Sequence, residues 1–592
     1  MLTSIVYIFT MPPSIWTGDS GEIATAAYVW GIAHPTGFPT YIILAKLFSY
    51  LLPWFEFAYR LNIFSALVGA ATIGIVFLIL QKLKIGLWPS LAAALSLAFG
   101  HTFWMHSGSI QVYSLTAFFF SLAILIFLHW LEKQQNKYLY LLAIIAGIGV
   151  GTHLTFLLFF PFALIFFVLK FLRGEIARIP VKHIAGCFCA FALSCSLVYS
   201  YIPLRAGQSP ELNWSNPSTK TAFINYITQR DYSEKIGNRS FESWTTMSQE
   251  LKRIFFREFT WLGLIIVLLG AAIAFRKNRP FFYAGLAVIF LNILLLGNYG
   301  NNDDIIILWR YFLPSYIIMA AFLGFAFDKA LQRGRFLLKT RVPFVIILPA
   351  IIFSAHIKAL DRHYNILIPE TSRIIFNILP QGSIFILGGD TLTGATMYEQ
   401  IALSQRKDIT VISQPLFTHP WYKEKKKQEM ESKGIQYSGD LTAVIRLNPK
   451  YEAYSLPNDM GALNVDYKFF PQGIIYKMYP KNEKLDFLSL ASKGQNFWQK
   501  QDLAFLKPKR VENEILSNEV VAFYTGGMNN LAAYLTNNKD VPGGIKYFKK
   551  SLEIRENKNA LYNLAGIYMA LGERQAALEY KKRFDALDAN KK

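Results

Sequence analysis

Two carboxylates near the start of the chain have the types and spacing that could do chemistry. Residues 18–22 read Gly-Asp-Ser-Gly-Glu, so Asp19 and Glu22 are three residues apart. On a helix that begins here, both side chains would lie on one face. The same pattern is typical of a plain helix N-terminus with Asp19 as its cap, and such a capped end can still hold a catalytic carboxylate. Next to a bilayer a carboxylate is costly, which favours a functional role.

A bent segment follows twelve residues after Glu22. His34 opens the sequence His-Pro-Thr-Gly-Phe-Pro, in which the two prolines exclude a regular helix and Gly37 permits a sharp bend. A lone histidine is more often structural than functional. Because it shares a polar segment with Glu22, we predict that His34 binds substrate.

Further candidates lie beside apolar stretches. Arg60 and Asn62 open one stretch, Trp104 and Tyr113 border the link between two others, and Arg205 follows a fourth. Snorkelling to the membrane interface explains both arginines equally well, and an interfacial aromatic belt explains Trp104. A planar guanidinium such as that of Arg205 could instead bind a phosphate bidentately.

The composition defines the elements that must position these residues. Of 592 residues, 53% are hydrophobic and 17% charged, which excludes a disordered chain and argues against an ordinary soluble protein. Residues 1–360 hold 28 Lys and Arg against 14 Asp and Glu, and residues 361–592 hold 32 against 25. The first part is a polytopic membrane domain and the second a soluble one. We find no nucleic-acid-binding motif, and the three cysteines form no disulfide or zinc pattern.

The apolar stretches and their basic links predict a topology. Residues 139–171 must cross twice for all basic links to share the cytoplasmic side, with Gly151 to His153 at the outer turn. This gives about eleven spans, an inner N-terminus and an outer C-terminal domain. The stretches lie at 1–12, 58–81, 86–103, 110–130, 139–171, 184–204, 259–275, 281–298, 307–327 and 342–360.

Two long polar segments, 13–57 and 205–258, then face the outside together with His153. Polar backbone at membrane depth persists only when it is buried in protein or lines a wet cavity. Residues 1–12 are too short and lack the basic flank of a signal peptide, so we expect either a short tilted helix or a start further upstream.

The second part of the chain divides again. Residues 361–485 read as an α/β domain, with buried strands at 383–387 and 409–412 around a helix at 395–406. Asp390 marks a turn or a ligand contact. Residues 486–592 are helical with tetratricopeptide-like spacing, which fits either a partner-binding groove or a helical cap.

Several motifs together resemble one family. Asp19-Ser-Gly-Glu22, the His34 segment and Arg60-Leu-Asn62 are similar, in this order, to membrane proteins of the transmembrane protein 260 type, whose animal member is an O-mannosyltransferase. The resemblance covers most of residues 11–425, and Gln111 stands where a Glu is expected. It continues at Gln111-Val-Tyr113, Gly151-Thr-His153, Pro203-Leu-Arg205, Asn213-Trp214, Gly388-Gly-Asp390, Tyr398-Glu-Gln400 and Asp408-Ile-Thr-Val411.

The resemblance implies a GT-C glycosyltransferase fold and a polyprenyl-phosphate sugar donor. It places Asp19 as the catalytic carboxylate and Glu22 as its companion. Asp19 would take the proton of the acceptor hydroxyl as it attacks the anomeric carbon with inversion. Cationic groups must then stabilise the leaving phosphate, for which Arg205, Arg60 and His153 are the candidates.

The resulting prediction is an inverting transferase of mannose to protein Ser or Thr at the outer face of a bacterial inner membrane. The predicted substrate-binding residues are His34, Arg60, Asn62, Trp104, Tyr113, His153, Arg205 and Trp214. No cofactor or metal is assigned, although Asp19 and Glu22 could share a divalent ion. The expected partners are the lipid-linked donor, a protein or glycan acceptor and membrane lipid. A glycan or lipid acceptor, a transporter and an assembly scaffold are the alternatives.

Overall fold

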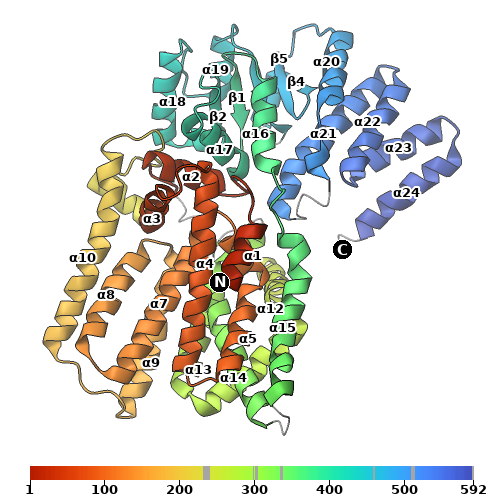
Figure 1. Cartoon of the computed structure of the whole chain (residues 1–592). Helices are drawn as coiled ribbons and strands as arrows, with labels where there is room; N and C mark the ends of the chain where they lie inside the picture. Colours follow the sequence, from red (N-terminus) through yellow and green to blue (C-terminus); the bar gives the residue numbers. More distant parts are fainter. Residues whose placement is uncertain are drawn as a thin grey trace. The chain divides into compact units, whose positions relative to one another are not determined.

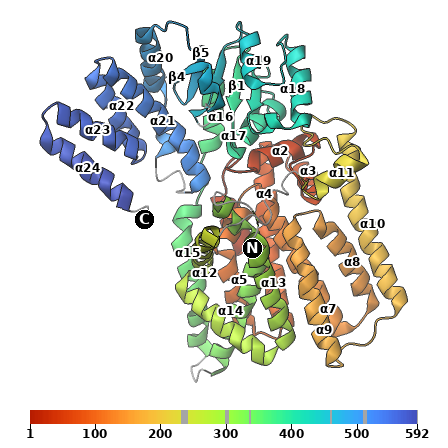
Figure 2. The ribbon, with the colours of Figure 1, turned by 180° about the vertical axis from the view of Figure 1, so that it is seen from behind.

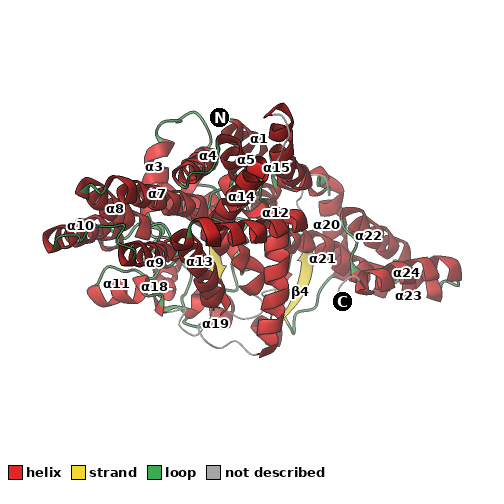
Figure 3. Cartoon of the chain, turned by 90° about the horizontal axis from the view of Figure 1, so that it is seen from below, coloured by secondary structure: helices red, strands yellow, loops and turns green. Residues whose placement is uncertain are grey.

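The computed structural model describes residues 1–230, 241–297, 299, 304–333, 338–457, 461–507 and 514–589. Residues 231–240, within the second predicted polar segment, lie outside the described residues. The chain forms two compact units. Unit 1 comprises Met1–Ser14 and Ile23–His363, and unit 2 comprises Ile15–Glu22 and Tyr364–Lys592. Helices dominate the fold (Figure 3).

Unit 1 is a bundle of long apolar helices that run side by side (Figure 1, and from behind in Figure 2). From the N-terminus, the helices are α1 (Leu2–Thr10), α2 (Ser20–Val29), α3 (Pro39–Ser49), α4 (Phe57–Lys82), α5 (Leu87–Ala98), α6 (His101–Ser107), α7 (Val112–Lys133), α8 (Asn136–Val150), η1 (Leu154–Leu158), α9 (Phe159–Leu172), α10 (Val181–Ala206), α11 (Lys220–Ile227), α12 (Phe241–Lys277), α13 (Arg279–Gly297), η3 (Asp304–Phe312), α14 (Leu313–Arg333) and α15 (Leu338–Leu360). α2 begins in unit 2 and continues into unit 1.

The chain is a multi-pass membrane protein. Among the described residues, seven helices are long and apolar enough to cross a bilayer, and three further apolar helices are shorter. The total of about eleven spans and their orientation stay predictions. The seven are Phe57–Lys82, Val112–Lys133, Leu154–Leu172, Val181–Ala206, Trp244–Lys277, Arg279–Gly297 and Leu308–Gln332.

The stretch 139–171 is interrupted where the sequence predicts a turn. α8 ends at Val150, and the backbone of His153 is extended with φ −168° and ψ 152°. The His153 ring nitrogen Nδ1 accepts the Thr155 N–H and so caps the next helical turn at 3.2 Å. The chain therefore forms two helices here, as the sequence predicts.

One predicted boundary differs. The sequence predicts a span that begins at residue 259, whereas α12 already begins at Phe241. Thr260 has non-helical backbone angles, φ 62° and ψ 169°, so two helices join end to end at a kink. The apolar pattern marks the second of them, and the polar first part hides the other from a hydropathy argument.

Unit 2 contains a mixed five-stranded sheet in the order β2-β1-β3-β5-β4. β1 (Ile384–Leu387) pairs in parallel with β2 (Thr410–Ser413) and β3 (Ala453–Ser455), which confirms the two predicted strands. β4 (Tyr467–Gln472) and β5 (Ile475–Pro480) form an antiparallel hairpin. All four β1 residues are apolar and buried, as expected of a central parallel strand.

Helices flank this sheet and then continue alone. The helix after β1, α17, begins at Asp390 rather than at the predicted residue 395, and Gly389 before it has φ +78°. The bounds are α16 (Leu367–Ile378), α17 (Asp390–Met397), η4 (Tyr398–Ala402), α18 (Pro420–Ser432), α19 (Leu441–Leu447), α20 (Phe487–Lys500), α21 (Ile515–Asn537), α22 (Val541–Ile554), α23 (Lys558–Ala570) and α24 (Arg574–Ala589). The tetratricopeptide assignment of the last four stays a prediction.

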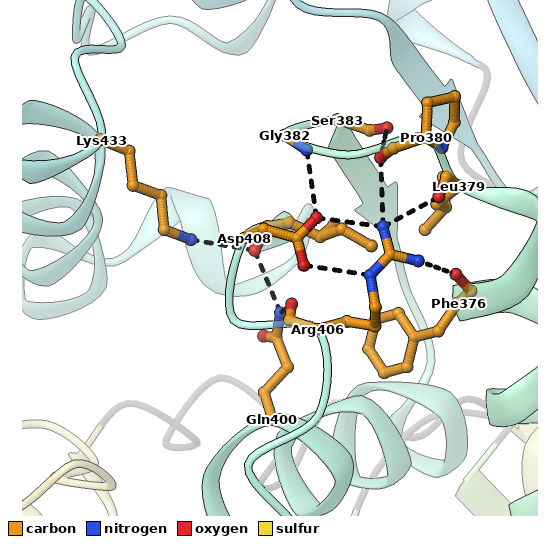
Figure 4. Close-up of polar contacts among 10 residues, drawn as sticks. Phe376, Leu379, Pro380, Gly382, Ser383, Gln400, Arg406, Asp408 and Lys433 are labelled. Atoms are coloured by element: carbon orange, nitrogen blue, oxygen red, sulfur yellow. Dashed lines mark hydrogen bonds and ion pairs between the residues drawn. The ribbon is translucent and has the colours of Figure 1, made fainter.

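A half-buried arginine, Arg406, ties the sheet to α16 (Figure 4). Arg406 Nε and Nη2 each lie 3.0 Å from a carboxylate oxygen of Asp408, and Nη2 also donates to the carbonyls of Leu379 (2.9 Å) and Pro380 (3.2 Å). Gly382 N donates to Asp408 at 3.1 Å. The hydrogen bonds from Arg406 lower the pKa of Asp408. Asp408, one of the family-like motif residues, therefore has a structural role here.

Two more side chains complete this network. Gln400 Nε2 donates to the carbonyls of Arg406 (2.9 Å) and Ile409 (3.0 Å), and Lys433 Nζ donates to the Ile409 carbonyl at 2.9 Å (Figure 4). Lys433 also pairs with Glu429 at 2.9 Å. Gln400 thus stabilises the turn before β2, which explains a second family-like residue without a catalytic role.

Candidate functional site

The segment that carries the predicted catalytic pair, residues 15–22, belongs to unit 2. Two hydroxyl groups fix its backbone. Trp16 N donates to Ser20 Oγ at 3.0 Å, and Gly18 N donates to Thr391 Oγ1 of α17 at 2.9 Å. Because backbone donors are satisfied on both sides of residue 17, the segment has a defined path rather than that of a free loop.

The glycine between the two carboxylates packs against the backbone of α17. A Cβ atom on Gly21 would lie 2.5 Å from the carbonyl carbon of Gly394, so a larger residue would displace the main chain. Asp19 directly precedes α2, and Glu22 lies in its first turn with only 7% of its surface exposed. Both carboxylates are thus held at a helix N-terminus, where the helix dipole favours negative charge.

Two cations hold the other end of α2, within unit 1. Lys46 Nζ donates to the Tyr28 carbonyl at 2.7 Å. Arg205 Nε donates to the Trp30 carbonyl at 2.7 Å, and its Nη2 donates to the Val29 carbonyl at 3.1 Å. These carbonyls have no partner inside the helix, and positive charge is favourable at a helix C-terminus. Arg205 therefore positions α2.

The two polar segments that the sequence predicts on one face pack against each other in unit 1. Ile32 N donates to the Leu212 carbonyl at 2.8 Å, and Trp214 N returns a bond to the Ile32 carbonyl at 3.2 Å. Tyr201 donates its hydroxyl to the Gly31 carbonyl at 2.9 Å. This pairing fixes the chain immediately before His34.

The predicted bend at Gly37 is confirmed. Gly37 has φ +81°, a conformation that other residues rarely adopt. A Cβ there would also lie 2.7 Å from the Tyr226 hydroxyl, which donates to the Ala33 carbonyl. The bend therefore depends on glycine for both its backbone angle and its space.

The bend carries the first rings of an aromatic cluster in unit 1. His34 lies edge-on to Phe38 and to Trp214, with ring centroids 4.9 and 6.0 Å apart. Phe38 in turn stacks on His153 at 6.0 Å with an interplanar angle of 18°. Ring contacts through His34 and Phe38 thus connect three predicted substrate-binding residues, His34, His153 and Trp214, from distant parts of the sequence.

His153 is the central ring of this cluster. It stacks on Tyr311 at 5.2 Å and 14°, and it contacts Tyr113 edge-on at 5.2 Å. Its Nδ1 atom also lies 3.0 Å from Thr155 Oγ1. Tyr113 is a fourth predicted residue that the fold brings into the cluster. Such rings combine flat apolar faces with a few polar edges.

The structure adds residues that the sequence reasoning missed. The Arg310 guanidinium lies over the rings of Tyr113 and Tyr311, 5.6 and 5.5 Å from their centroids. His106 contacts Tyr113 at 5.0 Å and Trp309 at 5.1 Å. In the sequence, Arg310 is flanked by a Trp and a Tyr at the start of a predicted span, a pattern that is typical of an interfacial anchor.

His106 is an unusual histidine. It is 3% exposed, and in the described part of the chain neither ring nitrogen has a hydrogen-bond partner. Burial, followed by the charges of Arg310 and Arg362, lowers the pKa of His106 well below its usual range. The ring is therefore neutral at physiological pH and can both donate and accept a hydrogen bond.

The short helix that carries His106 is clamped at both ends. Glu258 of α12 accepts the N–H groups of Thr102 (2.7 Å) and Phe103 (3.3 Å) at the start of α6. Arg362 Nη2 donates to the Met105 carbonyl near its end at 2.8 Å. These hydrogen bonds satisfy backbone groups at both ends of the helix, so α6 presents His106 in one orientation.

Two further candidates anchor the N-terminal residues of unit 1. Asn62 Nδ2 donates to the carbonyls of Pro12 and Ser14, both at 2.9 Å. Trp104 Nε1 donates to Thr10 Oγ1 at 2.9 Å, and its ring is fully buried. An interfacial belt position for Trp104 is thereby excluded. Both side chains fix the backbone that leads into residues 15–22.

Arg60 also bonds to backbone. Its Nε, Nη1 and Nη2 atoms donate to the carbonyls of Phe55 (2.6 Å), Ser49 (3.2 Å) and Pro53 (2.7 Å). These bonds close the loop between α3 and α4. They favour a structural role for Arg60 over the predicted contact with phosphate, as the bonds of Arg205 to α2 do for that residue.

Among the residues that the structure describes, no group of three or more His, Cys, Asp or Glu side chains is arranged to hold a metal ion.

The architecture is similar to that of a solved structure. The crystal structure of ArnT from Cupriavidus metallidurans in the apo state matches with a TM-score of 0.54. The match covers 80% of this chain and 95% of that chain at 11% sequence identity. The fold is that of the GT-C multi-pass membrane glycosyltransferases, as the sequence predicts.

The sequence comparisons then show which family the chain is similar to. Residues 19–175 match the family described as "Protein O-mannosyl-transferase TMEM260 N-terminal domain", and the match begins at Asp19. The mouse protein O-mannosyl-transferase TMEM260 is 24% identical over 487 residues, which are 78% of this chain and 67% of the mouse protein. Its Dictyostelium discoideum counterpart is 23% identical over 555 residues, 82% of this chain and 66% of that protein. The resemblance to this family is confirmed, and the chain spans about two thirds of the length of both relatives.

Proposed function

We propose that the protein transfers mannose from a polyprenyl-phosphate donor to Ser or Thr hydroxyls of proteins at the outer face of the membrane. The observation that carries the proposal is the fixed Asp19–Glu22 pair in a chain similar to protein O-mannosyltransferases. The membrane is proposed to be a bacterial inner membrane, with unit 2 outside. The two curated relatives are eukaryotic, so this assignment rests on the sequence alone.

In the proposed reaction Asp19 is the general base. It takes the proton from the acceptor hydroxyl as the oxygen attacks the anomeric carbon, and the bond from that carbon to the phosphate oxygen breaks with inversion. General base catalysis of this kind contributes roughly 10²- to 10⁴-fold in rate. Glu22, three residues further on the same helix end, positions Asp19 or the acceptor.

The aromatic cluster is proposed to bind the donor. Arg310 would stabilise the charge of the departing phosphate, because preorganised cations act most strongly in a site with little water. His34, Tyr113, His153 and Trp214 would line the sugar and phosphate. Their ring contacts support this assignment. Four other candidates act as positioning residues. The side chains of Arg60, Asn62 and Arg205 donate to backbone carbonyls, and that of Trp104 donates to Thr10 of α1.

The test is a transfer assay with the purified full chain in nanodiscs. Radiolabelled polyprenyl-phosphate mannose is the first donor, and Ser/Thr-rich protein and free cell-surface glycan are parallel acceptors. Label that enters protein supports the proposal. Label that enters only glycan would mean that the acceptor is a glycan rather than a protein. If no polyprenyl-phosphate sugar serves as a donor, a transporter or an assembly scaffold is favoured.

A further inference from the structure

A large cavity lies at the other end of unit 1, away from the aromatic cluster. Its volume is about 1290 Å³, and it is lined where the C-terminal ends of α4, α7, α9 and α14 meet the N-terminal ends of α8 and α13. Apolar side chains such as Leu125, Phe166 and Phe325 form part of its wall. Tyr113 and Glu132 mark the two ends of α7, about 30 Å apart by helix rise. The cavity is therefore separate from the proposed active site.

Positive charge dominates the polar part of this wall. Five Lys or Arg residues and three carboxylates line the cavity, a surplus of two positive charges. The cationic residues are Lys82, Lys84, Lys170, Arg173 and Lys277.

The ion pairs show where the surplus lies. Lys82 pairs with Glu132, Lys170 with Glu175, and Lys277 Nζ lies 3.1 Å from Asp328 Oδ2. Each carboxylate therefore has its own lysine. The two cations left over are Lys84, which forms no ion pair within the described residues, and Arg173, whose Nη1 is 3.9 Å from the carboxylate that Lys170 already neutralises.

We propose that this cavity binds an anionic membrane lipid, with its phosphate at Lys84 and Arg173 and its tail along the apolar wall. A guanidinium and an ammonium suit one phosphate group, and basic pockets between membrane helices are recognised sites for lipid headgroups. The apolar wall requires a ligand with a tail, which separates a lipid from free phosphate. The site goes beyond the proposed transfer reaction, because none of its residues takes part in it.

Native mass spectrometry of the full chain in detergent tests this site. The protein is titrated with phosphatidylglycerol, with phosphatidylcholine as the lipid without net charge, with undecaprenyl phosphate, and with inorganic phosphate as a competitor. The variant is Lys84→Ala with Arg173→Ala. The matched control is Lys133→Ala with Arg276→Ala, which removes two exposed cations that lie outside the cavity lining.

We expect the native chain to retain phosphatidylglycerol and to bind little phosphatidylcholine. Phosphatidylglycerol should bind roughly thirtyfold more weakly to the cavity variant, because each cation near an anionic lipid contributes about fivefold to the affinity. The control should bind as the native chain does, and both variants should unfold at the native temperature. If undecaprenyl phosphate binds more tightly than phosphatidylglycerol, the bound lipid has an isoprenoid tail. If phosphatidylglycerol binds more tightly, the bound lipid is a structural phospholipid. Equal losses in both variants, equal binding of phosphatidylcholine, or displacement by inorganic phosphate would overturn the proposal.

Discussion

Arg205 offers a sharp test of how α2 is held, because the sequence and the structure suggest different roles for it. From sequence, Arg205 is a candidate ligand for the donor phosphate. In the structure its guanidinium donates to the carbonyls of Val29 and Trp30 at the C-terminal end of α2. Arg205→Ala removes both bonds and leaves the phosphate chemistry of the other residues intact.

The expected cost follows from these contacts. A hydrogen bond with a charged partner contributes about 1.5–3 kcal/mol when buried, but Arg205 is half-buried and water can replace part of each bond. The helix dipole adds about 0.3–1 kcal/mol. We therefore expect Arg205→Ala to lower the unfolding free energy by about 1–2 kcal/mol. Loosening α2 misplaces Asp19 and Glu22 at its other end, so kcat should fall at least about tenfold.

The assay is SDS-induced unfolding in mixed micelles together with steady-state transfer at varied donor concentration. Arg205→Lys keeps the charge but cannot span both carbonyls, and should be intermediate. Arg178→Ala, an exposed arginine, is the control and should change neither quantity. A large rise in donor KM with unchanged stability would refute the positioning role and return Arg205 to the phosphate.

Three further predictions concern other parts of the fold. Gly37→Ala should lower stability by about 1–3 kcal/mol, measured by the same unfolding assay, because its φ is positive and its Cβ would meet Tyr226. Arg406→Ala should lower the thermal midpoint of unit 2, with a cost of about 2–3 kcal/mol, since it removes the ion pair with Asp408 and the hydrogen bond to the Leu379 carbonyl. Burial raises the pKa of Glu429, but the charges of two lysines outweigh it and bring the pKa to about 2. The resulting stability, roughly 3 kcal/mol, is present above the ordinary pKa and is lost as pH falls from about 4.5 to 2. Comparison with Glu429→Gln across this range measures it.

Each of these predictions can fail in a distinct way. A Gly37→Ala protein as stable as the native one would mean that the bend is not required. Arg406→Ala with an unchanged midpoint would show that the network in Figure 4 contributes little to stability. If the native chain and Glu429→Gln lose stability in parallel on acidification, the two lysines do not hold that carboxylate ionised.

Local patterns were enough to predict much of the fold. The apolar runs predict the long helices, the buried strand of residues 384–387 follows from its unbroken hydrophobicity, and glycine identity predicts the bend at Gly37. The early start of α12 and the start of α17 at Asp390 rather than at residue 395 were missed. In both cases the helix begins with mainly polar residues, which a hydropathy pattern does not mark as helical.

The candidate site was predicted less completely. His34, Tyr113, His153 and Trp214 were found and do meet, because polar or aromatic residues beside apolar stretches are a visible signal. Arg310 was missed because its contacts are made only by the folded chain. Arg60 and Arg205 show the opposite limit: residue type suggests phosphate binding, whereas the carbonyls they bond cannot be inferred from sequence.

The most direct test of the central claim compares the native chain with Asp19→Asn in transfer of radiolabelled mannose from polyprenyl-phosphate mannose to protein. Both proteins are purified in nanodiscs at equal folded yield. The account predicts that transfer falls by roughly 10²- to 10⁴-fold while the donor still binds, because the amide cannot take the hydroxyl proton. Transfer by Asp19→Asn at the native rate would contradict the assignment of Asp19 as the catalytic base.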